Sequence, residues 1–326
     1  MAAPHPESAD ARNHFEDLSG VDIASYKNPY DALIEACEND PSQIQARYDT
    51  HRTTRNGQQR ANLLSPGFSG LILDPILQRL EDPSIEPGYQ DPRNCLVFWA
   101  RPPPHIRSLA DKLQQELRGL APNLWLMPLL NLHMTALELT HSLTSPQIEA
   151  IITTLGTPAI ESMTDYPFSH RARLIKPALS FDGAAIALSF LPGAGESLLP
   201  VSAISSSDSR AREADNFSYH HLRRDLFNLA VRTGVEVDSR YVVPSSHITL
   251  GRFLAQDDHD GEKKMEGWLK KIDDLNIWLE DEYWPREGAE RREDAEWIIG
   301  QEKGLDFRKG ALWYGGGETV RVGKGF

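Results

Sequence analysis

The 326-residue sequence predicts an α+β fold built from two related halves about a pseudo-twofold axis. Two observations predict it. Strand-like and helix-like apolar patterns alternate from residue 94 onward, and the order strand, helix, strand, helix occurs twice. In both halves the second strand contains a histidine, an apolar residue and a threonine in succession. Because an internal duplication places equivalent positions across the symmetry axis, we expect the two patterns to meet.

The first half begins with an apolar run that is typical of a buried strand and that stops before three consecutive prolines at 102–104. Apolar residues then recur at spacings of three and four, which is typical of an amphipathic helix. A serine followed by a proline at 145–146 suits the start of the next helix. The predicted elements are a strand over 95–100, a helix over 106–120, a strand region over 124–139 and a helix from 145.

The second half repeats this order. A loop rich in serine, glycine and alanine at 193–215 separates its first strand from its helix. The predicted elements are a strand over 184–191, a helix over 217–234, a strand over 241–254 and a charged helix over 261–284. Further strands are predicted over 171–181, 297–300 and 311–314.

Residues 1–93 differ from the rest of the chain. They are polar and irregular, prolines interrupt their second half, and only 30–36 and 75–80 suggest short helices. We expect an N-terminal extension that packs on the main body, residues 94–326, and that is partly flexible at its start. The sequence leaves its role open.

The amino-acid composition and net charge indicate which classes of binding partner to expect. The chain has 40% hydrophobic and 25% charged residues, as in ordinary globular proteins, and a formal net charge of −13. No basic stripe is present, so no long nucleic acid is expected as a partner, whereas a small anionic substrate stays compatible. No apolar run approaches the about 18 residues of a membrane span, so no membrane is expected as a partner. Two cysteines and a start without a secretory pattern favour the cytoplasm, with the nucleus as an alternative.

The repeated pattern reads His133-Met-Thr135 in the first half and His247-Ile-Thr249 in the second. Side chains alternate faces along a strand, so each histidine shares a face with its threonine while the apolar residues point to the other face. Each strand can therefore bury one face and present an imidazole and a hydroxyl on the other. A third match, His51-Arg52-Thr53, lies in a polar stretch without a strand pattern, and we interpret it as accidental.

The two segments resemble the paired signatures of the two-histidine phosphoesterase superfamily. That group includes RNA-processing cyclic phosphodiesterases, bacterial RNA 2′-5′ ligase-like proteins and related fungal proteins. The resemblance covers about residues 94–326. It implies a bilobal fold in which two antiparallel sheets flank a central cleft, with helices outside. It also implies a metal-independent phosphodiesterase that acts on a cyclic or 2′-5′-linked nucleotide or an RNA end, without a cofactor.

The residue types suit that chemistry. One imidazole must accept a proton while the other donates one, and the pKa of histidine lies near neutrality. His133 and His247 are therefore the candidate base and acid, in an order that the sequence does not fix. Thr135 and Thr249 are candidate substrate-binding residues that would donate hydrogen bonds to the non-bridging oxygens. A bell-shaped pH–rate profile is expected. No cluster of residues with metal-ligand spacing is seen, so no metal site is predicted.

Three aromatic residues are candidates for the pocket wall. Phe253 shares strand parity with His247, and Trp313 and Tyr314 precede three glycines. Parity directs Arg252 away from the His247 face, so we expect it to have a structural role.

Two alternatives to catalysis on a phosphodiester remain open at this stage. The same fold can serve as a nucleotide-binding module without turnover. It can also carry out acid–base chemistry on a non-phosphate metabolite. The sequence leaves the substrate and the oligomeric state open.

Overall fold

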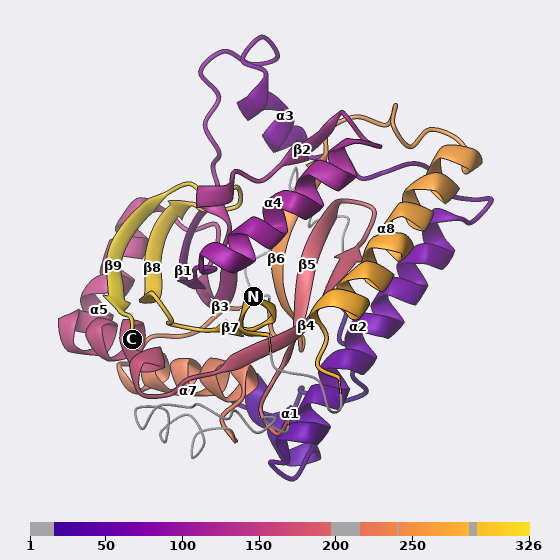
Figure 1. The fold of residues 1–326 in the computed structure, drawn as a ribbon. Helices are drawn as coiled ribbons and strands as arrows, with labels where there is room; N and C mark the ends of the chain where they lie inside the picture. The colour runs from indigo at the N-terminus through magenta and orange to yellow at the C-terminus, as the bar shows by residue number, and fades with distance from the viewer. Residues whose placement is uncertain (1–15, 197–215, 240, 287–291) are drawn as a thin grey trace.

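The computed structural model describes residues 16–196, 216–239, 241–286 and 292–326. It contains two antiparallel sheets, which confirms the predicted α+β class (Figure 1). One sheet has the strand order β3-β1-β8-β9, and the other has the order β2-β6-β5-β4-β7. The strands are β1 (Asn94–Ala100), β2 (Leu124–Leu126), β3 (Met134–Thr140), β4 (Arg173–Phe181), β5 (Ala185–Pro192), β6 (Ser246–Phe253), β7 (Trp297–Ile298), β8 (Lys303–Ala311) and β9 (Glu318–Lys324).

The predicted duplication is visible in the strand order. In the first half, β1 and β3 are antiparallel neighbours joined through a helix, and in the second half β5 and β6 have the same relation. The order β3-β1-β8-β9 thus corresponds to β6-β5-β4-β7, with β2 added beside β6. Strand β3, which His133 immediately precedes, and strand β6, which contains His247, contact each other where the sheets meet. The helices are α1 (Pro29–Ala36), α2 (Pro41–Leu63), α3 (Pro75–Glu81), α4 (Pro104–Arg118), α5 (Ser145–Thr164), α7 (Tyr219–Arg232) and α8 (Glu262–Tyr283).

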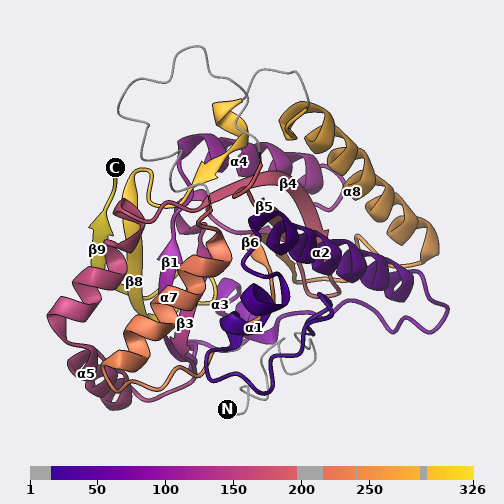
Figure 2. The same cartoon turned by 90° about the horizontal axis from the view of Figure 1, so that it is seen from below.

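Two helices cross from one sheet to the other. Helix α4 follows β1 but packs against β6, and it meets α8 through the Glu116–Lys271 ion pair. Helix α7 follows β5 but packs against β3 and α5. Figure 2 shows α5 and α7 together beside the first sheet, with α4 and α8 at the second. Each sheet is therefore covered by one helix from each half of the chain.

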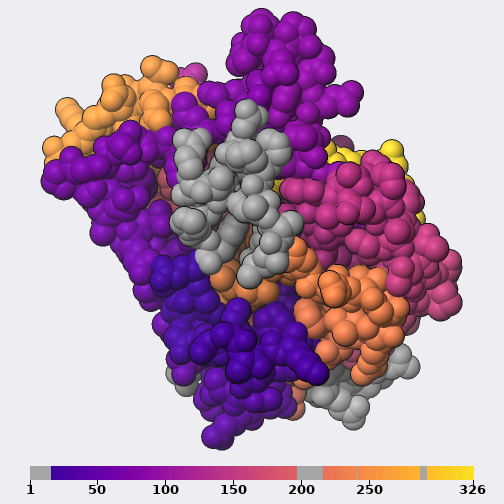
Figure 3. Space-filling model, turned by 180° about the vertical axis from the view of Figure 1, so that it is seen from behind, coloured from indigo at the N-terminus to yellow at the C-terminus, as the bar shows by residue number. Residues whose placement is uncertain are grey.

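The N-terminal segment is more regular than predicted, because 41–63 forms the long helix α2. Helix α2 lies along β4 and β5, beside α8, and α1 packs on α7 (Figures 1 and 2). Seen from behind, the indigo and purple N-terminal segment forms a large part of one face (Figure 3). Tyr30, Ile44 and Tyr48 are buried in the same apolar core as the sheets. Residues 16–93 therefore share the core of the main body.

The C-terminal region also differs from expectation. Residues 311–314 are not a separate strand: Ala311 ends β8, and the chain then turns into β9, which the sequence did not suggest. The predicted loop at 193–215 falls for the most part outside the described residues. Within the described ranges, no helix combines the length and apolar character that crossing a membrane requires.

Candidate functional site

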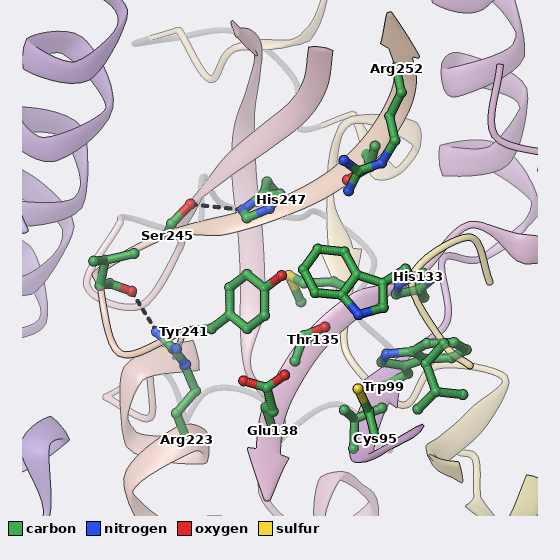
Figure 4. Close-up of a pocket in the computed structure, with 16 residues that line it drawn as sticks. Cys95, Trp99, His133, Thr135, Glu138, Arg223, Tyr241, Ser245, His247 and Arg252 are labelled. Atoms are coloured by element: carbon green, nitrogen blue, oxygen red, sulfur yellow. Dashed lines mark hydrogen bonds between the residues drawn. The ribbon is translucent and has the colours of Figure 1, made fainter. Parts of the chain in front are cut away.

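His133 and His247 line one pocket between the two sheets, together with both predicted threonines (Figure 4). His133 comes immediately before β3, and His247 is the second residue of β6. Strand alternation places Thr135 and Thr249 on the pocket side, as expected. The pocket has a volume of about 70 Å³. Its polar lining residues include His133, Thr135, Glu138, Arg223, His247, Thr249 and Arg252.

The ring of His133 is held on two sides. Its Nδ1 lies 2.7 Å from the carbonyl oxygen of Asn131, to which it donates, so the Nε2 lone pair is left unprotonated. The ring stacks on Trp99, with ring centres 3.8 Å apart and planes inclined by 19°. The guanidinium of Arg101 lies 4.7 Å from the centre of the Trp99 ring and donates to the backbone carbonyl of Leu132. Position and tautomer of His133 are thus set by neighbouring groups.

Burial is the main reason that His133 is neutral, and it lowers the pKa to about 3. The positive charges of Arg101 and Arg308 lower this pKa further, while the hydrogen bond to Asn131 opposes them. A neutral imidazole with a free Nε2 can accept a proton from water.

The surroundings of His247 are similar, with one difference in charge. Its Nδ1 lies 2.9 Å from the Oγ of Ser245 (Figure 4). Burial lowers its pKa to about 4, and Arg55 lowers it further. Asp182 acts in the opposite direction and favours the protonated form. Asp182 forms an ion pair with Arg55, and Arg223 and His51 also lower the pKa of His247. The charges around His247 are therefore mixed, whereas the charged side chains that act on His133 are cations.

A β-bulge follows each histidine–threonine pair. Phe98 pairs with Leu137 and Trp99 with Thr135, so Ala136 is an extra residue in β3. In β6, Ile186 pairs with Gly251 and Ala187 with Thr249, so Leu250 is the extra residue. An extra residue reverses the alternation of side chains beyond it. The third residue after each threonine, Glu138 in β3 and Arg252 in β6, therefore lines the pocket.

This bulge overturns two expectations. Arg252 does not point away from the His247 face, because the parity argument assumed an unbroken strand. Phe253, expected at the pocket wall, is buried on the other side against His259 and Trp268, and it does not line the pocket.

The bulge in β6 is supported by its neighbours. The carbonyl of Leu250 accepts hydrogen bonds from the backbone N–H of Met127 at 2.9 Å and from the side chain of Gln114 at 2.9 Å. At Gly251 a Cβ atom would lie 2.7 Å from the carbonyl oxygen of Trp125 in β2. Only glycine lets the two strands approach this closely, so β2 and α4 together hold the bulge that turns Arg252 into the pocket.

The N-terminal segment reaches Arg252 through Asp74, the residue that caps α3. The Asp74 carboxylate lies 3.6 Å from the guanidinium of Arg252 and accepts a hydrogen bond from the Tyr314 hydroxyl at 2.8 Å. Tyr314 also accepts from Arg93 and is not among the residues that line the pocket. Its neighbour Trp313 does line it. Of the predicted wall residues, only Trp313 is where it was expected.

A second arginine enters the pocket from α7. Arg223 is buried, its guanidinium lies 4.5 Å from the ring centre of Tyr30, and it donates to the Val243 carbonyl at 2.8 Å. Figure 4 shows Arg223 and Arg252 at opposite ends of the pocket, with His247 and Thr135 between them. The pocket thus holds two cations and one carboxylate, Glu138, beside the two imidazoles, which gives it an excess of positive charge. Such a pocket suits an anion.

A second cavity, of about 120 Å³, adjoins the first at His247 and Thr249. Helix α2 supplies part of its wall, including His51, whose match to the histidine–threonine pattern we interpreted as accidental. The pattern of apolar residues in α2 did not indicate that His51 lines a cavity. In the described parts of the chain, no group of three or more His, Cys, Asp and Glu side chains is arranged to hold a metal ion.

Comparison with known proteins gives little further information about this protein. No family model and no curated protein sequence matches the chain. Among solved structures, the chain is similar to the crystal structure of TT0787 from Thermus thermophilus, with 15% sequence identity and a TM-score of 0.33. That similarity covers 70% of this chain and 96% of the other.

Proposed function

We propose that the protein is a phosphodiesterase in which His133 and His247 transfer the protons, acting on a cyclic or 2′-5′-linked nucleotide or an RNA end. The observation that carries the proposal is that both imidazoles line one small pocket together with two arginines. Hydrolysis of a phosphodiester needs a base for the attacking water and an acid for the departing oxygen. It also needs positive charge for the phosphoryl oxygens, which Arg252 and Arg223 supply.

The surrounding charges support one assignment of the two roles. His133 is neutral and has a fixed, free Nε2 lone pair, which suits a base that takes a proton from water. His247 is the one of the two imidazoles with a carboxylate, Asp182, among the charged groups that act on it, so we assign it as the acid that protonates the leaving ribose oxygen. The water oxygen forms the new bond to phosphorus as the bond to the ribose oxygen breaks. Thr135 and Thr249 donate to the non-bridging oxygens.

The proposal is tested by replacing each histidine. His133→Ala and His247→Ala should each lower turnover of nucleoside 2′,3′-cyclic phosphates by about 10²–10⁴-fold, because each removes a proton-transfer group. The rates are measured by chromatographic separation of substrate and product. His170→Ala is the matched control, since its ring stacks on Tyr166 outside this pocket and its loss should leave turnover unchanged.

Three results would contradict the proposal. Near-normal hydrolysis by either variant would show that the imidazoles do not transfer the protons. Tight binding of nucleoside monophosphates by the unaltered protein, with no hydrolysis of cyclic or 2′-5′-linked substrates, would identify a binding module instead. Failure of inorganic phosphate to bind at the pocket would point to a substrate without a phosphate group.

A further inference from the structure

The second cavity lies between helix α2 and the cleft side of the β4-β5-β6 sheet. Ser180, Ala187 and Thr249 form a row across the three strands, since each is paired with the next in register. All three line the cavity, and Tyr48, His51 and Arg55 of α2 line it from the opposite side. His247, Thr249 and Arg252 line both this cavity and the histidine pocket. The two spaces therefore adjoin each other at these side chains.

The cavity has the size and lining of a site for a flat ring. Its sheet side carries the small residues Ala185, Ala187 and Ser189, and aromatic rings of Tyr48 and Phe181 add to the wall. Its volume of about 120 Å³ is near the ~150 Å³ of an engineered cavity that holds benzene. The rest of the lining is largely polar and includes the Arg55 and Asp182 side chains, so the edge of a bound ring would meet hydrogen-bonding groups.

Those polar groups include an unpaired donor. Nδ1 of His51 accepts a hydrogen bond from the backbone N–H of Leu18 at 3.1 Å, so the ring proton is on Nε2. The residue is 3% exposed, and among the described residues no partner for Nε2 is found. On the sheet side, Ser189 donates to the Ala178 carbonyl at 2.9 Å. Ser180 can therefore donate to Ser189, which leaves the Ser180 oxygen as an acceptor. A donor and an acceptor thus lie in the wall of the cavity.

Helix α2 is fixed to the sheet by hydrogen bonds along its length. The Arg55 guanidinium and the Asp182 carboxylate form an ion pair at 2.6 Å. The side chains of Gln45, Arg52 and Asn56 donate to backbone carbonyls of β5 and β4 at 2.8, 2.7 and 3.1 Å. The cavity is therefore preformed, and binding does not require α2 to be ordered first.

We infer that the cavity between α2 and β5 binds the nucleobase of a nucleotide whose phosphate lies between His133 and His247. This inference rests on the proposed function for the position of the phosphate. It gives the N-terminal segment a role in substrate recognition: α2 supplies one wall of the base site, and His51 donates a hydrogen bond to the edge of the base.

Calorimetry on the full-length protein tests this inference. The probes are the four nucleoside 2′-monophosphates, the four nucleosides and inorganic phosphate. Ser180→Leu fills the cavity from β4, two strands away from His247, and His51→Ala removes the donor. Each should weaken binding of the preferred nucleoside monophosphate by about tenfold or more and leave inorganic phosphate binding unchanged within about twofold. Thr54→Leu adds an apolar side chain on the exposed side of α2 and should change neither.

The outcomes separate this inference from the proposed function. Nucleoside monophosphates that bind no tighter than inorganic phosphate would overturn the inference, as would equal losses for both probes in the variants. Nucleoside binding that Ser180→Leu abolishes, in a protein without hydrolytic activity, would support the inference and reject the proposed function. Thermal unfolding of each variant shows that it is folded. If Ser180→Leu does not fold, His51→Ala decides.

Discussion

At the scale of single residues, the protonation states of His133 and His247 determine how the reaction should depend on pH. Burial and cationic neighbours hold both imidazoles neutral, with pKa values of about 3 and about 4. A lowered pKa means that the protonated form is lost as pH rises through that value. Catalysis in the proposed scheme needs His247 in its protonated form. The fraction of the free protein in that form falls as the pH rises above about 4.

We therefore predict that kcat/KM falls by about tenfold per pH unit between about pH 5 and pH 8, because it reports the free protein. A bound phosphodiester anion favours the imidazolium of His247, so kcat should fall only at higher pH. Steady-state rates at constant ionic strength provide the measurement. A kcat/KM that is flat or rises with pH over this range would contradict the assignment of His247 as the acid.

Strand alternation predicted some of the side-chain positions at the site correctly and others wrongly. It placed His133 and Thr135, and equally His247 and Thr249, on one side of their strands, because no irregularity separates the members of each pair. It failed beyond Thr249, because one extra residue reverses the pattern. The sequence offers Gly251 as the single sign of that bulge, and a glycine within a strand can equally mark a tight bend or a close approach of another backbone.

At the scale of elements, α2 is the largest feature that the sequence did not reveal. Helix prediction depends on an apolar stripe, and α2 buries polar side chains such as His51 and Arg52 beside Ile44 and Tyr48. One of its sides meets a polar cavity and the backbone of β4, so hydrogen bonds take the place of apolar contacts. Asp40 followed by Pro41 was a usable signal, since this pair commonly starts a helix.

Contact between elements also leads to a prediction for Gln114 of α4, whose side chain donates to the carbonyls of Met127 and Leu250 at 2.7 and 2.9 Å. Gln114→Met keeps the volume but removes both hydrogen bonds, one of them at the bulge that positions Arg252. It should lower the free energy of unfolding by about 1–3 kcal/mol and raise KM more than it changes kcat. Urea unfolding and steady-state kinetics test this.

The neighbouring Gln115→Met is the matched control for this experiment, because Gln115 is exposed on the same helix. It should change neither stability nor KM. A loss of stability in Gln114→Met without any change in KM would mean that the bulge does not depend on this side chain.

At the scale of the whole molecule, buried neutral histidines couple stability to pH. Their pKa values lie at about 3 or about 4, below the about 6.5 of an exposed histidine. Burial is the main cause in each case. Below about pH 6.5 the unfolded chain binds protons that the folded protein does not, until the pH reaches the folded pKa. The histidines concerned are His51, His133, His220, His221, His247 and His259.

We predict that the melting temperature falls steeply from about pH 7 to pH 5, since each such histidine contributes up to about 1.4 kcal/mol per pH unit. Thermal unfolding at both pH values measures the effect. His259→Phe is an informative variant, because neither ring nitrogen of His259 has a hydrogen-bond partner among the described residues and its ring packs against Trp268. It should reduce the pH dependence. An unchanged dependence in His259→Phe would refute this account of the coupling.

The repeated order of strands and helices was sufficient to predict two related halves, and the family resemblance implied a cleft between them. It did not predict which sheet each helix covers. An amphipathic stripe, such as the one that includes Ile106, Leu109 and Leu113, shows that a helix must pack on something apolar. It carries no information on which of two apolar sheets that is, and only the connection lengths and the three-dimensional path decide.

The crossing of α4 and α7 has a mechanical consequence. Gln114 of α4 is bonded to β6, and the Tyr219 hydroxyl of α7 donates to the Thr135 carbonyl of β3 at 2.9 Å. A hinge motion that separated the lobes would have to pull each helix from the sheet of the other half. The two lobes therefore form one rigid unit, because each lobe is held by a helix from the other half of the chain. The separation of His133 and His247 is set when the chain folds, and a substrate has to fit it.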